Sequence, residues 1–288
     1  MIEFADAIRS SGLEPPISIE PGTVIRFPGI GKGAKNKAAW CLLFDDCMGG
    51  VFGDYSSGLY EVWQSRRTQT YTPEQRTEFM RQVEASRKAH AAERQAMQRQ
   101  ASQKAAAIIK QARIEQHAYL DSKSFKDAVG LVYYPDEDTN LLVVPMRVGE
   151  SVVGCQMIDR EGNKKFLKGQ RTNGAEFVIG QTGVDVWCEG YATALSVHSC
   201  LAAMKIPARV HACFSAGNLQ RMAKTGLVVA DNDPGSCAGI KAAKSTGLPY
   251  WVSDSPGEDF NDFHQRIGTF KAGMELRKFL LGVRRLAA

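Results

Sequence analysis

Residues 184–194 read Val-Asp-Val-Trp-Cys-Glu-Gly-Tyr-Ala-Thr-Ala, and the same order, an apolar run followed by acidic residues, returns at 226–235 and 250–262. The later segments read Gly-Leu-Val-Val-Ala-Asp-Asn-Asp-Pro-Gly and Tyr-Trp-Val-Ser-Asp-Ser-Pro-Gly-Glu-Asp-Phe-Asn-Asp. A short β-branched run that is followed by Gly or Pro and then by a helical pattern is typical of a parallel strand. The three segments therefore predict three parallel strands, each ending in carboxylates.

The whole segment after residue 183 alternates between strand and helix patterns. Such alternation produces right-handed crossovers and a parallel sheet that is covered by helices on both faces. We therefore predict an α/β fold here (α+β for the whole chain). The predicted strands are 184–188, 209–214, 227–230 and 250–253, and the predicted helices are about 192–204, 216–222, 237–246, 261–267 and 270–281.

The acidic residues of the three segments are candidate metal ligands, because groups at the carboxyl ends of parallel strands converge on one crevice. Carboxylates that lie together unpaired repel one another, and a divalent cation resolves the conflict. Mg²⁺ takes oxygen ligands from one or two carboxylates and from substrate phosphates. The predicted metal ligands are Glu189, Asp231, Asp233, Asp259 and Asp262.

Each acidic motif also has a purely structural interpretation. The Asp-Asn-Asp-Pro-Gly segment at 231–235 would serve as a hydrophilic turn before a helix, and Glu189 would be favoured near a helix N-terminus by the helix dipole. However, Asp231 and Asp233 flank one residue, so in an extended loop both side chains point the same way and can share a metal. The occurrence of all three motifs at strand ends favours the metal site.

Taken in order, Glu-Gly-Tyr-Ala-Thr-Ala (189–194), Asp-x-Asp-Pro-Gly (231–235) and Asp-x-Asn-Asp (259–262) resemble a Toprim domain. Bacterial primases, type IA and type II topoisomerases and some nucleases share this domain. The Ala-Thr-Ala continuation is most similar to TraC-type primases of conjugative plasmids and to primase–helicases of satellite phages. The resemblance extends over 141–180 and, more loosely, over 21–63, so it touches about two thirds of the chain.

The resemblance implies a cytoplasmic DNA primase of plasmid, mobile-element or phage replication. Such an enzyme makes short RNA primers on single-stranded DNA from ribonucleoside triphosphates with Mg²⁺ or Mn²⁺, and a replicative helicase is a further expected partner. The implied catalytic residues are Glu189, as general acid/base, with Asp231 and Asp233. Two alternatives remain open: a Toprim-type Mg²⁺-dependent nuclease, and a non-catalytic module that binds single-stranded DNA.

Residues 127–183 predict an antiparallel β meander upstream of the parallel sheet, with strands at 131–134, 141–146, 151–158 and 164–167. A basic strip lies at its end, and its nearest acidic neighbour is Glu161. Triphosphates and template backbone both need cations, although a solvated hairpin is the alternative. The candidate nucleotide- or template-binding residues here are Lys164, Lys165, Lys168 and Arg171, to which we add Asn261 in the third acidic motif.

Residues 1–71 predict a small β-rich module with strands at 23–27, 39–44 and 50–54. Its Gly-rich loop carries three lysines, which either contact nucleic-acid phosphates with the help of nearby aromatic residues or form a solvated hairpin turn. The resemblance to the N-terminal module of TraC-type primases favours phosphate contact. The residues concerned are Lys32, Lys35 and Lys37, with Trp40, Phe52, Tyr55 and Trp63. Zinc is not expected, because Cys41 and Cys47 have no second Cys pair and no nearby His.

Residues 72–126 predict a helical linker. Thr72-Pro73-Glu74-Gln75 is a helix start, and neither Gly nor Pro occurs from Glu74 to Tyr119, so a helix of about 45 residues would span about 70 Å. It would be either an arm along a nucleic-acid backbone or a solvated connecting helix, and its mixed charges favour the second. The predicted domains are thus 1–71, 72–126, 127–183 and 184–288.

The composition of the 288 residues, 44% hydrophobic and 23% charged, is that of an ordinary globular protein. No apolar run approaches the roughly 20 residues of a membrane span, and the N-terminus shows no secretory signal. Seven scattered cysteines fit a reduced, cytoplasmic chain. The net charge of +5 permits nucleic-acid binding without requiring it.

Overall fold

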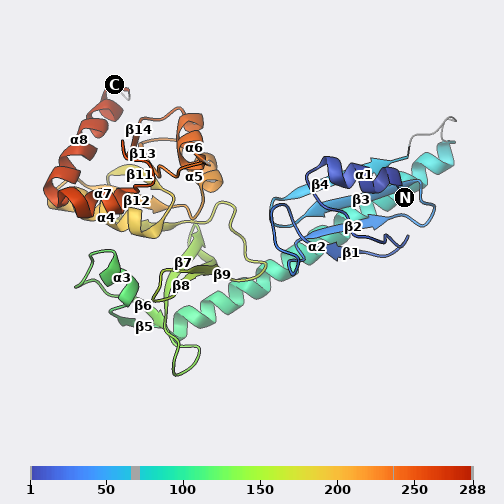
Figure 1. The fold of residues 1–288 in the computed structure, drawn as a ribbon, viewed down its shortest axis with the longest axis horizontal. Coiled ribbons are helices and arrows are strands. Elements are labelled where there is room, and N and C mark those ends of the chain that lie inside the picture. Colours follow the sequence, from blue (N-terminus) through green and yellow to red (C-terminus); the bar gives the residue numbers. More distant parts are fainter. Residues whose placement is uncertain (1, 66–71, 236, 287–288) are drawn as a thin grey trace. The chain divides into compact units, whose positions relative to one another are not determined.

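The computed structural model describes residues 2–65, 72–235 and 237–286, and in these ranges it contains eight helices and three β-sheets. The chain divides into two compact units, Met1–Arg94 and Gln95–Ala288. The mixed α/β class, with an antiparallel meander and a mostly parallel sheet flanked by helices, is confirmed (Figure 1).

The first unit is a four-stranded antiparallel sheet in the order β1-β2-β3-β4. Helix α1 (Ile2–Ser10) packs on it through Phe4 and Ile8, which are both fully buried. Gly50 allows this contact, because a Cβ there would lie 2.9 Å from the ring of Phe4. The strands are β1 (Ile25–Phe27), β2 (Ala39–Leu43), β3 (Gly49–Asp54) and β4 (Leu59–Gln64). Strand β4 is absent from the predicted set.

Helix α2 (Pro73–Gln111) begins at the predicted N-terminus but is shorter than predicted. The Thr72 hydroxyl accepts from the Gln75 N–H, and the Gln75 side chain accepts from the Thr72 N–H, which is the expected capping box. The helix ends before β5 (Arg113–Glu115), which pairs with β6 in the second unit. Arg, Ile and Glu tolerate a helix, so strand pairing has overridden local preference here.

The second unit begins with a five-stranded antiparallel meander in the order β5-β6-β7-β8-β9. One face of this sheet is covered by the C-terminal half of α2, where Ala101, Ala105 and Ile108 are buried. The other face packs through Leu142, Val144 and Ile158 on Tyr119 of helix α3 (Ala118–Ser122) and on Tyr191. The remaining strands are β6 (Gly130–Tyr133), β7 (Leu141–Val148), β8 (Ser151–Ile158) and β9 (Lys164–Phe166).

The mostly parallel sheet has the order β10-β12-β11-β13-β14. Four strands are parallel, and β10 (Phe177–Ile179), which is not in the predicted set, joins the edge antiparallel to β12. The parallel strands are β11 (Val184–Cys188), β12 (Ala208–Ala212), β13 (Leu227–Ala230) and β14 (Tyr250–Val252).

Helices cover both faces of this sheet, as Figure 1 shows. Side chains of a strand alternate between the faces, so Val186 faces the core beneath α4, α7 and α8, while Trp187 faces the core beneath α5 and α6. The helices are α4 (Tyr191–Ala203), α5 (Ala216–Met222), α6 (Ala238–Thr246), α7 (Phe260–Ile267) and α8 (Thr269–Leu286).

The two observed units differ from the four predicted domains. The boundary at Arg94 lies inside α2, and residues 113–122 of the predicted linker supply a strand and a helix of the second unit. None of the helices in the described ranges is both long enough and apolar enough to cross a membrane.

Candidate functional site

The site is built at the carboxyl ends of two adjacent strands. Glu189 directly follows β11 and Asp231 directly follows β13, and these strands pair in parallel with Cys188 opposite Val229. The register therefore carries both carboxylates to the same edge of the sheet, as the sequence predicts. Asp233 lies two residues beyond Asp231, where it is exposed.

Asp231 is the most strongly perturbed carboxylate of the cluster. Burial, followed by the charges of Glu189, Asp259 and Asp233, raises the pKa of Asp231 from 3.8 to about 7, although Lys164 opposes the shift. Its Oδ1 atom is buried and has no hydrogen-bond partner. A buried carboxylate oxygen without a donor, among other carboxylates, is a fitting ligand for a divalent cation.

Glu189 is also partly desolvated. Burial and then the charge of Asp233 raise the pKa of Glu189, while a hydrogen bond from the backbone N–H of Ala216 and the charge of Lys164 act in the opposite direction. Glu189 is therefore held closer to the point where it can give or take a proton near neutral pH.

Asn232 and Gly239, which lie outside the predicted site residues, position Asp231. The side chain of Asn232 donates to the carbonyl oxygens of Ser253 (2.9 Å) and Ser255 (3.3 Å), which ties the loop after β13 to the loop after β14. Gly239 at the start of α6 is buried, and a Cβ there would lie 2.7 Å from the Asp231 carbonyl oxygen. Only glycine lets α6 approach the backbone of Asp231 this closely.

The third acidic motif delivers one of its two predicted ligands. The charge of Asp259 reaches Asp231, and Asp259 also caps α7 by accepting from the Asp262 N–H at 2.9 Å. Asp262 is exposed, and its nearest ion-pair partner is Lys123, at 4.0 Å. Asp262 therefore lies at the exposed start of α7 beside Lys123, and its charge is not among those that shift the pKa of Asp231, in contrast to its predicted role.

Asn261 is a structural residue, in contrast to its predicted contact with nucleotide or template. It is fully buried, and its Nδ2 donates to the Lys123 carbonyl oxygen (3.1 Å) and to Ser196 Oγ (2.9 Å). Its Oδ1 accepts from Gln265 Nε2 at 2.8 Å. The amide is thus used up in joining α3, α4 and α7.

The basic strip is split by the pleat of β9. Lys164 pairs with Ile158, whose side chain faces α3 and α4, whereas Lys165 pairs with Met157, whose side chain faces α2. Accordingly, the charge of Lys164 lowers the pKa of Glu189 and of Asp231, whereas the charge of Lys165 lowers the pKa of Asp159. Lys168 and Arg171 are exposed, and Arg171 donates to the Asn173 carbonyl oxygen.

The predicted phosphate loop of the first unit keeps its lysines exposed. Lys32, Lys35 and Lys37 lie on a loop that Asn36 orders by accepting from the N–H groups of Gly29 and Ala38. The aromatic residues do not support the loop in the predicted way. Trp40 and Phe52 are each 3% exposed and belong to the core, Trp63 packs on Phe4, and the Tyr55 hydroxyl donates to Glu93.

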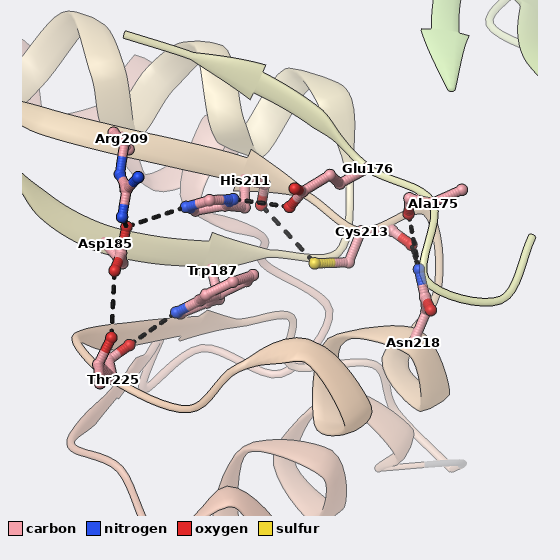
Figure 2. A network of polar contacts seen from close by, with 9 residues as sticks. All are labelled: Ala175, Glu176, Asp185, Trp187, Arg209, His211, Cys213, Asn218 and Thr225. Carbon is pink, nitrogen blue, oxygen red and sulfur yellow. Dashed lines mark hydrogen bonds and ion pairs between the residues drawn. The ribbon is translucent and has the colours of Figure 1, made fainter. Parts of the chain in front are cut away.

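A polar network of His211 and two carboxylates lies at the end of the sheet near β10, and nothing in the sequence indicates it (Figure 2). The ring of His211 lies between two carboxylates, with Nδ1 2.7 Å from Glu176 and Nε2 3.2 Å from Asp185. Trp187 stacks on this ring at a centroid distance of 3.9 Å. Asp185 also accepts from Arg209 and Thr225. These bonds join β11 and β12 to Glu176, the residue before β10.

Comparisons with known proteins add no family to this geometry: no family model matches the sequence, and no curated protein matches it either. Within residues 2–65, 72–235 and 237–286, no three or more His, Cys, Asp or Glu side chains form a ready-made metal site. Mg²⁺ needs only one or two carboxylates when phosphate oxygens and water complete its octahedron. The buried Oδ1 of Asp231 fits such a site.

Without metal, Asp231 should make the protein less stable as the pH rises, because the folded state binds its proton more tightly than the unfolded state does. The loss should begin near pH 4 and be complete above the folded pKa of about 7. A shift of this size corresponds to about 4 kcal/mol at most. With EDTA at about pH 8, Asp231→Asn should therefore raise the free energy of unfolding by about 2–4 kcal/mol, but have little effect at about pH 4.

Urea unfolding at both pH values measures this difference, and the exposed Asp233→Asn variant is the control, for which we expect a smaller gain. A pH dependence of stability that is the same in Asp231→Asn as in the wild-type protein would contradict the assignment of a desolvated charge.

Asp185→Ala should destabilise the protein by about 2–3 kcal/mol, because it leaves Arg209 and His211 without their shared acceptor. Burial would raise the pKa of Asp185, but the hydrogen bonds from His211, Arg209 and Thr225 hold it below its ordinary 3.8. Asp185 therefore stabilises the fold above that pH and ceases to do so as the pH falls through its folded pKa. Thermal unfolding at neutral pH tests this, with the exposed Asp127→Ala as control; equal melting of the two variants would refute it.

Proposed function

We propose that this chain is a DNA primase of the Toprim type, which makes short RNA primers on single-stranded DNA from ribonucleoside triphosphates. The observation that carries the proposal is the buried, unpartnered oxygen of Asp231 beside Glu189 and Asp259, with Lys164 facing them. The order of the three acidic motifs, which resembles Toprim primases, supports the same activity. The proposal also includes a cytoplasmic role in plasmid, mobile-element or phage replication, with a replicative helicase as partner.

Asp231 and Asp233 would hold Mg²⁺ or Mn²⁺, with Asp259 close enough to add its charge. When bound, the ion supplies neutralisation of the triphosphate oxygens and alignment of the attacking and leaving groups. A bound ion would also offset the burial and the neighbouring charges that together raise the pKa of Asp231, so the folded state favours a loaded site.

The protein's own residues then divide the remaining work. Glu189, whose pKa is raised by burial, accepts the proton of the attacking primer hydroxyl at its carboxylate. Lys164 places a point charge beside the same carboxylates, where it binds a phosphate of the incoming nucleotide. Asn232 and Gly239 act indirectly, because they hold the loop that carries Asp231.

Asp231→Ala and Glu189→Gln should each abolish primer synthesis, with a loss of at least about 10³-fold, because one removes a metal ligand and the other removes the proton acceptor. The assay incubates the full chain with single-stranded DNA, labelled ribonucleotides and Mg²⁺ or Mn²⁺. Asp127→Ala, an exposed carboxylate of the same unit, is the control and should keep full activity.

Synthesis that survives in both site variants would overturn the assignment of the site. Wild-type cleavage of DNA without added nucleotides would identify the alternative, a Mg²⁺-dependent nuclease. Binding of single-stranded DNA with neither synthesis nor cleavage would identify the non-catalytic module.

Lys164→Ala should raise the KM for ribonucleotides about tenfold or more, whereas Lys165→Ala should leave it within about twofold, because the strand pleat turns Lys165 toward α2. The two variants remove the same charge from neighbouring positions, so each controls for the other's effect on net charge. Steady-state rates at varied nucleotide concentration measure the difference. Equal increases in KM would show that both lysines attract the nucleotide only through the net positive charge of the protein.

A further inference from the structure

Two phenylalanine rings, Phe166 and Phe214, contact each other, and the backbone of Phe214 is bonded to Glu189. Phe166 is the last residue of β9 and is 42% exposed. Its ring meets that of Phe214 edge-on, with the centroids 6.4 Å apart and the planes at 85°. Phe214 lies two residues beyond the end of β12, and its N–H donates to the Glu189 carbonyl oxygen at 2.8 Å. The pair therefore borders the proposed catalytic glutamate.

Phe214 has an unusual backbone, with a φ of 65° in the left-handed region that bulky side chains avoid. Such a conformation persists only where its surroundings fix it. Here the N–H of Cys213 donates to the Cys188 carbonyl oxygen at 2.9 Å, and the N–H of Phe214 donates to Glu189, so the turn is bonded to the end of β11. The fold thus holds Phe214 in a strained backbone conformation that is bonded to Glu189, with its ring packed against the core around Tyr119 and Tyr191.

Phe166 shares a strand face with Lys164. The two residues are two positions apart on β9, so their side chains leave the same face about 7 Å from each other. Lys164 is the cation that acts on Glu189 and Asp231, and it thus marks where a phosphate would lie. The ring of Phe166 lies two residues further along β9, about as far from that phosphate position as a ribose separates phosphate from base.

We propose that Phe166 and Phe214 form a stacking subsite for the nucleobase of the incoming nucleoside triphosphate. The inference rests on the proposed function, since it uses the same phosphate position. A template base is the less favoured occupant. Lys164 marks a phosphate position beside the catalytic carboxylates, and the reacting triphosphate must lie there, whereas the template backbone need not. Every base has a π-face, so the subsite accepts all four nucleotides and leaves their selection to the template.

The test measures equilibrium binding of two probes to the full chain with Mg²⁺: ATP, and inorganic tripolyphosphate, which has no base. Phe166→Ala should weaken ATP binding about tenfold and leave tripolyphosphate binding within about twofold. Lys164→Ala should weaken both probes, because it removes the phosphate contact. Phe166→Tyr should keep the wild-type preference for ATP, since it keeps a ring to stack on.

Phe270→Ala is the matched control, because Phe270 is 71% exposed on α8, and it should change neither probe. Phe166→Leu retains an apolar side chain on the strand but has no π-face, so it should behave as Phe166→Ala does and thereby separate stacking from folding. Equal weakening of both probes by Phe166→Ala, or of neither, would overturn the subsite. Loss of binding to a single-stranded oligonucleotide with unchanged ATP binding would instead assign the rings to the template and would also overturn it.

Primer synthesis is scored separately, so the two proposals can fail independently. If the wild-type protein makes no primers, but Phe166→Ala still loses the preference for ATP over tripolyphosphate, the primase proposal fails and the subsite proposal stands. If primer synthesis depends on Asp231, but Phe166→Ala leaves ATP binding unchanged, the subsite proposal fails and the primase proposal stands.

Discussion

The second unit depends on one electrostatic constraint, the desolvation of the Asp231 carboxylate beside Glu189 and Asp259. A sheet that ends in several carboxylates has to separate them, neutralise them or protonate them. This one does not separate them: Gly239 lets α6 press on the Asp231 backbone, and Asn232 ties the same loop to the segment after β14. The packing therefore maintains an electrostatic conflict, and the free energy released when a cation or a proton resolves it is available for binding.

The meander makes the other half of the site through its strand register. Its two faces have different partners, α2 on one side and α3 with α4 on the other. Because β9 pairs with β8 in a fixed register, only alternate residues of β9 reach the parallel sheet, and these are Lys164 and Phe166. A shift by one residue would exchange Lys164 for Lys165 and remove the aromatic ring from the carboxylates. The register of this short strand thus defines the chemistry of the site as much as the acidic residues do.

The sequence predicts those features that follow from a local period. Apolar runs followed by Gly or Pro located β11, β13 and β14, and hence Glu189 and Asp231. Strands β5 and β10 were missed, because β5 continues a helix-compatible sequence after α2, β10 is a three-residue strand, and both form only through pairing with strands further along the chain. The basic strip was predicted as one surface, although the pleat of a strand divides it. Asn261 shows the remaining limit, since an amide in an acidic motif looks like a ligand until its burial is known.

Among the described strands, β9 also ends its sheet, since β8 is the one strand that pairs with it. The unpaired edge of a sheet is a template on which another polypeptide can add a strand, and lysines along such an edge discourage this addition. Lys164 and Lys165 lie on this edge strand, where charged side chains disfavour such addition. Replacing these lysines with apolar residues would expose an edge that pairs readily with another strand, which restricts the sequences open to β9.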